Sequence, residues 1–211
     1  SLTPSDVFEW GDFACTDVLQ YSYRPVQLDV KTTDHYDRLF AADVPTLETT
    51  LGETLGVHPG KRINQEEEPV LVLGCGNSKF GEDLIEHGWN GPILQVDVSS
   101  RVVHDLTERC RDEERIQVFQ DDAAVLSAIE DETISALVDK GLVDAVFCAD
   151  DVQQCREILQ TAHRVLKKGG VFCCFSFSRP QFFLPKILPH NLWESLELRC
   201  LPNIYLYRFC K

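Results

Sequence analysis

The amino-acid sequence predicts an α/β protein with a doubly wound, mostly parallel seven-stranded sheet, helices on both faces and a C-terminal antiparallel hairpin. Two observations support this fold class. Short apolar runs alternate four times with helix-like segments after residue 69, a pattern typical of parallel strands joined by crossover helices. The last two strand-like runs are separated by Pro202 and Asn203, which favour a tight antiparallel turn.

Seven segments have the composition of β-strands. Five belong to the predicted parallel sheet and two to the hairpin: residues 70–73, 92–96, 115–119, 134–138, 171–177, 193–201 and 204–210. Four helices are predicted between them, at residues 80–87, 100–111, 123–129 and 151–167. The last helix ends in Lys167, Lys168 and Gly169, and both basic side chains and glycine are typical of helix C-termini.

Residues 1–65 lack this alternation, and we expect them to form an N-terminal extension that packs on the core. Within them, three leucines at i, i+4 spacing predict an amphipathic helix over residues 45–55. Residues 57–68 combine Pro, Gly and three consecutive Glu, which indicates an exposed loop. Residues 66–211 are therefore the predicted ligand-binding domain.

The composition argues against several classes of function. No apolar run approaches the roughly 20 residues of a membrane-spanning helix, so we expect no membrane association. The nine cysteines include no CxxC pair, which argues against a metal site or a disulfide scaffold and favours the reducing cytoplasm. The formal net charge of −14 argues against direct nucleic-acid binding and favours a basic protein partner, although the same charge also serves solubility. We expect a monomer rather than an oligomer.

A glycine-containing turn follows the first predicted strand. Its residues are Gly74, Cys75, Gly76, Asn77 and Ser78. Two glycines allow a ligand to approach the backbone closely, and the ligands of such sheets bind beyond the carboxyl ends of the strands. A dinucleotide-binding turn needs a third glycine where this sequence has Lys79, so the turn is better suited to a ligand with an amino-acid end. A glycine turn without a ligand remains the alternative.

Carboxylates end the next three strands. Asp97 can accept hydrogen bonds from both hydroxyl groups of a ribose, or it can cap the next helix in competition with Ser99. Asp122 can accept a hydrogen bond from an adenine amine beside the small Ala123, or it can cap a helix. Asp139 is followed by Lys140 and Gly141, and we expect this pair of charges to line the pocket.

Together these residues resemble the class I methyltransferases, and more narrowly the methyltransferase-like 13 group, which includes lysine methyltransferases of translation elongation factor 1-alpha. The resemblance covers residues 69–211 and rests on five segments in order: Leu73-Gly74-Cys75-Gly76-Asn77-Ser78, Asp97-Val98-Ser99, Asp122-Ala123, Asp139-Lys140-Gly141-Leu142-Val143-Asp144-Ala145 and Arg164-Val165-Leu166-Lys167-Lys168-Gly169-Gly170. The wider class has an acidic residue at the position of Val72 and a glycine at that of Ser78.

The resemblance implies S-adenosylmethionine as the cofactor. It implies that the turn beginning at Gly74 holds the methionine part. It assigns the remaining cofactor contacts to Asp97, Val98, Ser99, Asp122, Ala123, Asp139 and Lys140. In this family an N-terminal aromatic segment covers the cofactor, and Glu9 and Trp10 match its acidic-Trp pair. Residues 1–65 are thereby predicted to include a lid.

The same resemblance implies methylation of a protein lysine, with a basic protein such as a translation factor as substrate. A lysine must lose a proton before it can attack, and its pKa is about 10.4 in water. Carboxylates attract the cationic amine, and the candidates are Asp139, Asp144 and Glu9, with Asp139 preferred for positioning. Methyl transfer needs no enzyme nucleophile.

Two other functions stay open. The chain can be a methyltransferase for a small molecule, although residues 178–193 are short for an inserted cap over the pocket. It can also be a module that binds S-adenosylmethionine without catalysis. A nicotinamide-dependent enzyme is the least favoured function, because Lys79 stands where a dinucleotide-binding turn has its third glycine.

Overall fold

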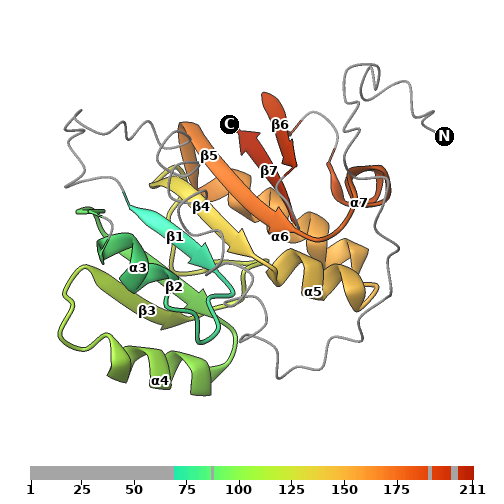
Figure 1. Cartoon of the computed structure of the whole chain (residues 1–211). Helices are drawn as coiled ribbons and strands as arrows, with labels where there is room; N and C mark the ends of the chain where they lie inside the picture. Colours follow the sequence, from blue (N-terminus) through green and yellow to red (C-terminus); the bar gives the residue numbers. More distant parts are fainter. Residues whose placement is uncertain (1–68, 87, 190–191, 201–203) are drawn as a thin grey trace.

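The computed structural model describes residues 69–211 except residues 87, 190–191 and 201–203. The predicted lid in residues 1–65, the helix over residues 45–55, and Glu9 and Trp10 lie outside the described residues. The described part contains one mixed sheet with helices on both faces (Figure 1).

The sheet has seven strands in the order β3-β2-β1-β4-β5-β7-β6. Their bounds are β1 Val70–Leu73, β2 Ile93–Asp97, β3 Ile116–Gln120, β4 Ile134–Lys140, β5 Leu166–Ser176, β6 Ser195–Cys200 and β7 Tyr205–Cys210. The first five strands are parallel, and β7 pairs antiparallel with both β5 and β6. The predicted fold class and the C-terminal hairpin are confirmed.

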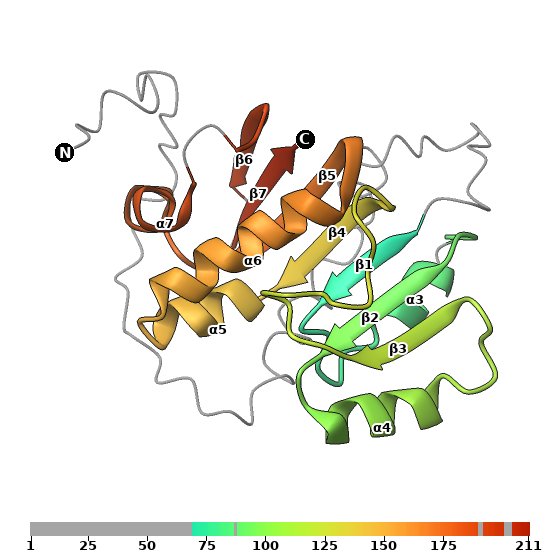
Figure 2. The ribbon, with the colours of Figure 1, turned by 180° about the vertical axis from the view of Figure 1, so that it is seen from behind.

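The helices divide between the two faces. Figures 1 and 2, which view the molecule from opposite sides, show α3 across one face and α6 across the other. The helices are α3 Phe80–Glu86, α4 Ser100–Arg109, α5 Leu142–Cys148, α6 Val152–Val165 and α7 Pro180–Ile187. The strand order reverses between β1 and β4, so the carboxyl ends of these two strands form the switch point where ligands of such sheets bind.

Alternate side chains of each strand enter different halves of the core. Leu71, Leu73 and Leu137 pack with α6 and α7 on one face. Val72 and Val138 belong to the opposite half, with Leu106 of α4. Because parallel strands are buried on both faces, β1 is entirely apolar and entirely buried. This rigid layer fixes the position of the loops at the strand ends.

The predicted helix over residues 123–129 is wrong, because this segment forms turns. Leu126 has a φ of 47°, which a right-handed helix does not accommodate. Side chains of α6 bind the carbonyl groups that a helix would use: Thr161 Oγ1 donates to Ala124 O at 2.6 Å, and Arg164 Nη2 donates to Leu126 O at 3.1 Å. Tertiary contacts thus replace the helical hydrogen bonds.

Two helices have no counterpart among the predicted elements. The short α5 begins directly after the Asp139-Lys140-Gly141 segment, and the Asp139 carboxylate supplies acceptors for its first N–H groups. In α7, Pro180 occupies the first turn, where its missing N–H is not needed.

Candidate functional site

The loop after β1 is held in a left-handed conformation. Gly74 and Gly76 both have a φ of 55°, a value that glycine adopts without the steric cost borne by other residues. Cys75 N donates to Val96 O of β2 at 3.0 Å, and Ser78 N donates to Cys75 O at 3.3 Å. The loop is therefore a compact turn anchored on the neighbouring strand.

Replacing Gly74 by alanine should destabilise the fold more than replacing Gly169. Both glycines have positive φ, and the conformational penalty of about 1–2 kcal/mol applies to both. A Cβ on Gly74 would lie 2.9 Å from Leu142 Cβ, whereas a Cβ on Gly169 would meet nothing within 4 Å. Overpacking adds about 1–3 kcal/mol at Gly74 alone. Urea unfolding of both variants measures this difference, and equal losses would contradict it.

Asp97, at the end of β2, binds the glycine loop directly. Its Oδ2 accepts a hydrogen bond from Gly76 N at 3.0 Å, and its Oδ1 accepts one from Ser99 N at 2.9 Å. The next side chain, Val98, is 70% exposed. Ser99 caps α4, since its Oγ accepts from Val102 N.

The end of β3 lies beside that of β2, because Asp121 N donates to Asp97 O at 3.2 Å. Asp121 organises the following turns: its carboxylate accepts from Asp122 N and Ala128 N. Those hydrogen bonds lower the pKa of Asp121 in spite of its partial burial. Asp122 is half-buried and accepts from Ala124 N at 2.9 Å, while Ala123 is buried.

Asp139 is completely buried at the end of β4. Its carboxylate accepts from Leu142 N at 2.7 Å, from Val143 N at 3.2 Å and from Cys174 Sγ at 3.2 Å. Burial raises the pKa of Asp139 to about 7, although these three donors oppose the shift. The carboxylate thus faces the N-terminus of α5 and the core.

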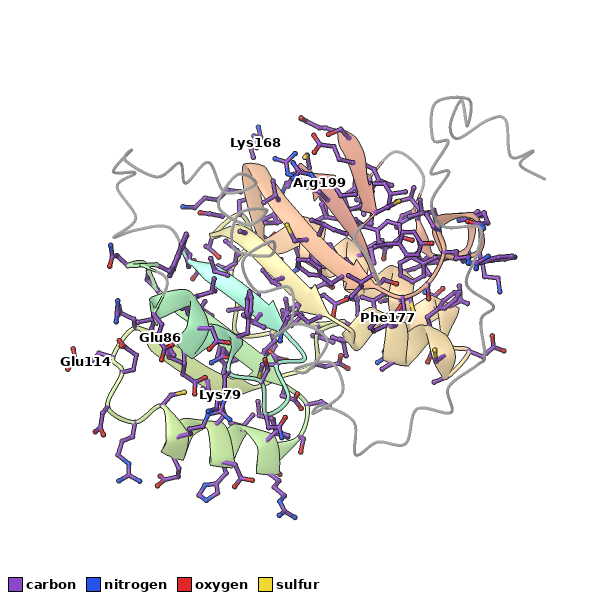
Figure 3. The ribbon with its side chains drawn as sticks, in the orientation of Figure 1. Lys79, Glu86, Glu114, Lys168, Phe177 and Arg199 are labelled. Carbon is purple, nitrogen blue, oxygen red and sulfur yellow. The ribbon has the colours of Figure 1, made fainter. Side chains whose placement is uncertain are left out.

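Asp144, in α5, joins that helix to the end of β5. It accepts from Ser176 Oγ at 2.5 Å, from Phe177 N at 2.7 Å and from Ser178 Oγ at 3.0 Å. Figure 3 shows Phe177 at the carboxyl end of β5 and Lys168 at the opposite end. Burial raises the pKa of Asp144 as well. Neither Asp139 nor Asp144 presents a carboxylate to solvent in this arrangement.

Lys140 reaches from β4 to the glycine loop. Its Nζ donates to Ser78 Oγ at 2.5 Å and lies 5.0 Å from the centroid of the Phe80 ring. The predicted site residues on β1, β2, β3 and β4 are therefore brought together at four adjacent strand ends. Glu9 and Trp10 cannot be placed, because they lie outside the described residues.

Sequence reasoning missed one contact of this loop, the guanidinium of Arg109 at the end of α4. Its position in the sequence carries no signal, because a basic residue at a helix C-terminus is common for other reasons. Among residues 69–211 that the structure describes, no group of three or more His, Cys, Asp or Glu has the arrangement of a metal site. None of the helices in that part of the chain is long and apolar enough to cross a bilayer.

The arrangement suits a nucleoside with a zwitterionic end. An exposed apolar side chain at Val98 can contact a flat ring, and carboxylates at Asp97 and Asp122 can accept hydrogen bonds from hydroxyl or amine groups. Lys140 supplies a positive charge beside the glycine loop, where a carboxylate would be attracted.

Comparisons with known proteins show which family this part of the chain resembles. Residues 70–170 match the family described as "Methyltransferase domain". The human eEF1A lysine and N-terminal methyltransferase is 32% identical over 136 residues, covering 63% of this chain and 19% of the human protein. Its homolog from Drosophila pseudoobscura pseudoobscura is 29% identical over 178 residues, covering 80% of this chain and 26% of that protein. The chain spans about a fifth to a quarter of the length of these curated relatives.

Solved structures show the same fold. A Methanococcus maripaludis protein described as an S-adenosyl-L-methionine-dependent methyltransferase superposes with a TM-score of 0.60 at 19% identity, covering 90% of this chain and 97% of that one. A TehB-like methyltransferase from Corynebacterium glutamicum gives a TM-score of 0.54 at 17% identity, covering 84% and 99%.

Proposed function

We propose that residues 70–170, which match the family described as "Methyltransferase domain", form a class I S-adenosylmethionine-dependent methyltransferase domain, and that this chain methylates the amine of a lysine in a basic protein, such as a translation factor. One observation carries most weight: the Asp97 carboxylate holds Gly76 N at 3.0 Å while Lys140 holds Ser78 Oγ at 2.5 Å. Two strand ends therefore meet on one loop, at the switch point of the sheet.

The residues present fit the cofactor. Gly74 and Gly76 carry no side chain, so a ligand such as the methionine part can approach the loop backbone closely, and Lys140 is placed to attract its carboxylate. The ribose hydroxyl groups would be bound by Asp97, and the adenine amine by Asp122 beside Val98 and Ala123. The cofactor, when bound, supplies the electrophilic methyl group.

The chain's own residues contribute position and exclusion of water. Asp139 and Asp144 fix α5 between β4 and β5, so the strand ends around Lys140 keep their spacing. In-line transfer requires this precision, because the acceptor must approach the methyl group at a fixed angle. A contact of Asp139, Asp144 or Glu9 with the acceptor amine stays a prediction.

The charge supports a basic acceptor. With 34 acidic and 20 basic residues the chain has a formal charge of −14, which attracts cationic proteins over long range. The relatives at about 30% identity are named as eEF1A lysine and N-terminal methyltransferases or their homologs. None of the eight described cysteines forms a disulfide, and our proposal includes a cytoplasmic location.

A transfer assay with methyl-labelled S-adenosylmethionine tests the proposal. The full chain is incubated with purified eEF1A, and the control is eEF1A whose lysines have been blocked by acetylation. We expect label in the unblocked protein alone, at a lysine identified by mass spectrometry. Label only in small molecules would overturn the choice of acceptor, and cofactor binding without any turnover would overturn the enzymatic function.

A further inference from the structure

Arg109, the last residue of α4, is bonded to the backbone of the glycine loop. Its Nη1 donates to Asn77 O at 2.8 Å, and its Nη2 donates to Ser78 O at 2.5 Å. These two carbonyl groups are consecutive in the chain. A single guanidinium therefore fixes the orientation of two successive peptide planes in the loop.

The same guanidinium also binds α3. Arg109 Nε donates to Glu82 Oε1 at 2.7 Å, and Nη2 donates to Glu82 Oε2 at 3.1 Å, with the two side chains 31% and 26% exposed. All three guanidinium nitrogens are thus in use. A lysine cannot reproduce these contacts, because its ammonium is a single point rather than a planar fork.

Fixing the carbonyls also fixes the N–H groups. In a planar trans peptide the C=O and the following N–H point in opposite directions. Holding Asn77 O and Ser78 O on Arg109 therefore directs the N–H groups of Ser78 and Lys79 away from the guanidinium. Asp97 holds Gly76 N on the preceding peptide. The loop is constrained along its length before any ligand arrives.

We propose that Arg109 is a positioning residue for cofactor binding, acting by pre-ordering the glycine loop. This inference rests on the proposed function, because it concerns the same loop and the same cofactor. A loop that is already ordered loses less conformational freedom on binding, so affinity rises without a direct contact. The turnover of bound cofactor should be independent of Arg109.

The competing explanation is that Arg109 only joins α4 to α3 through Glu82. The two roles separate at Glu82→Gln, which removes the ion pair but leaves both loop carbonyls bonded to Arg109. Arg109→Ala removes both sets of contacts, and Arg109→Lys keeps the charge but not the fork. Arg101→Ala is the matched control, since Arg101 lies on the same helix and is 90% exposed.

Calorimetry with S-adenosylhomocysteine on the full 211-residue chain tests the proposal. We expect Arg109→Ala and Arg109→Lys each to raise the dissociation constant about tenfold. Glu82→Gln should change it less than about threefold, and Arg101→Ala should leave it unchanged. In the two Arg109 variants, kcat and the KM for the acceptor protein, both measured at saturating cofactor, should stay at the values of the unsubstituted chain.

Two results would overturn the inference alone. One is unchanged affinity in both Arg109 variants. The other is an equal loss in Arg109→Ala and Glu82→Gln, which would assign the effect to the link between the helices. If the unsubstituted chain binds neither S-adenosylhomocysteine nor S-adenosylmethionine, the proposed function fails, and the inference fails with it.

Discussion

Replacing Asp97 by alanine should abolish measurable binding of S-adenosylmethionine, with a rise in the dissociation constant of about a hundredfold or more. Two losses combine in this variant. Gly76 N loses its acceptor at 3.0 Å, which loosens the glycine loop. The cofactor would also lose the carboxylate that we propose for its ribose hydroxyl groups. Calorimetry and thermal shift with the cofactor measure both effects.

Asp97→Asn separates the two losses. Asparagine keeps one acceptor oxygen, so the hydrogen bond from Gly76 can persist while the charge for the ribose is lost. We expect an affinity between those of the alanine variant and the unsubstituted chain. Asp105→Ala is the control, because Asp105 is an exposed residue of α4. An alanine variant at position 97 that binds the cofactor normally would show that Asp97 serves only its backbone contacts with Gly76 N and Ser99 N.

Replacing Asp139 by asparagine should change how stability depends on pH. Burial raises the pKa of Asp139 to about 7, from 3.8 for a free side chain. Between these two values the folded chain holds a proton that the unfolded chain has released. The free energy of unfolding due to this group therefore falls as the pH rises from about 4 to about 7, and is constant above.

The free energy of unfolding contributed by Asp139 should fall by about 1.4 kcal/mol per pH unit at most, and by a few kcal/mol over the whole range. Urea unfolding at pH 5, 6, 7 and 8 gives the free energy of unfolding of both chains, and the value for Asp139→Asn is subtracted from the value for the unsubstituted chain. This difference should decrease with pH and level off near pH 7. Asp105→Asn, on the surface of α4, should leave the profile unchanged.

A flat difference would mean that Asp139 titrates well outside this range in the folded protein. Asp144, whose negative charge contributes to the raised pKa of Asp139, provides a second test. Asp144→Asn removes that charge, so it should shift the falling part of the profile to lower pH. An unshifted profile would show that burial alone accounts for the pKa of Asp139.

The sheet was predictable from the sequence because its strands are buried on both faces. Val70 to Leu73 is a continuous apolar run that ends in Gly-Cys-Gly, as expected for a buried parallel strand that enters a tight turn. The terminal hairpin was predictable from the break at Pro202 and Asn203. For the same reason the strand ends, and with them the residues of the candidate site, could be located without coordinates.

The elements that sequence reasoning missed depend on distant partners. Residues 123–129 have acceptable helix propensity, but Thr161 and Arg164 on α6 take their carbonyl groups. The contact of Arg109 with Asn77 joins residues 32 positions apart, and no local pattern encodes it. The burial of Asp139 was equally invisible, because a carboxylate at a strand end is more often exposed to a ligand.

The position of β7 has a consequence for how the protein is made. This strand lies between β5 and β6, although it follows both in the chain. During synthesis on the ribosome, the edge of β5 stays unpaired until residues 205–210 leave the exit tunnel, and β6 has no partner until then. An apolar edge such as Val171 to Phe175 can pair with the edge of another nascent chain.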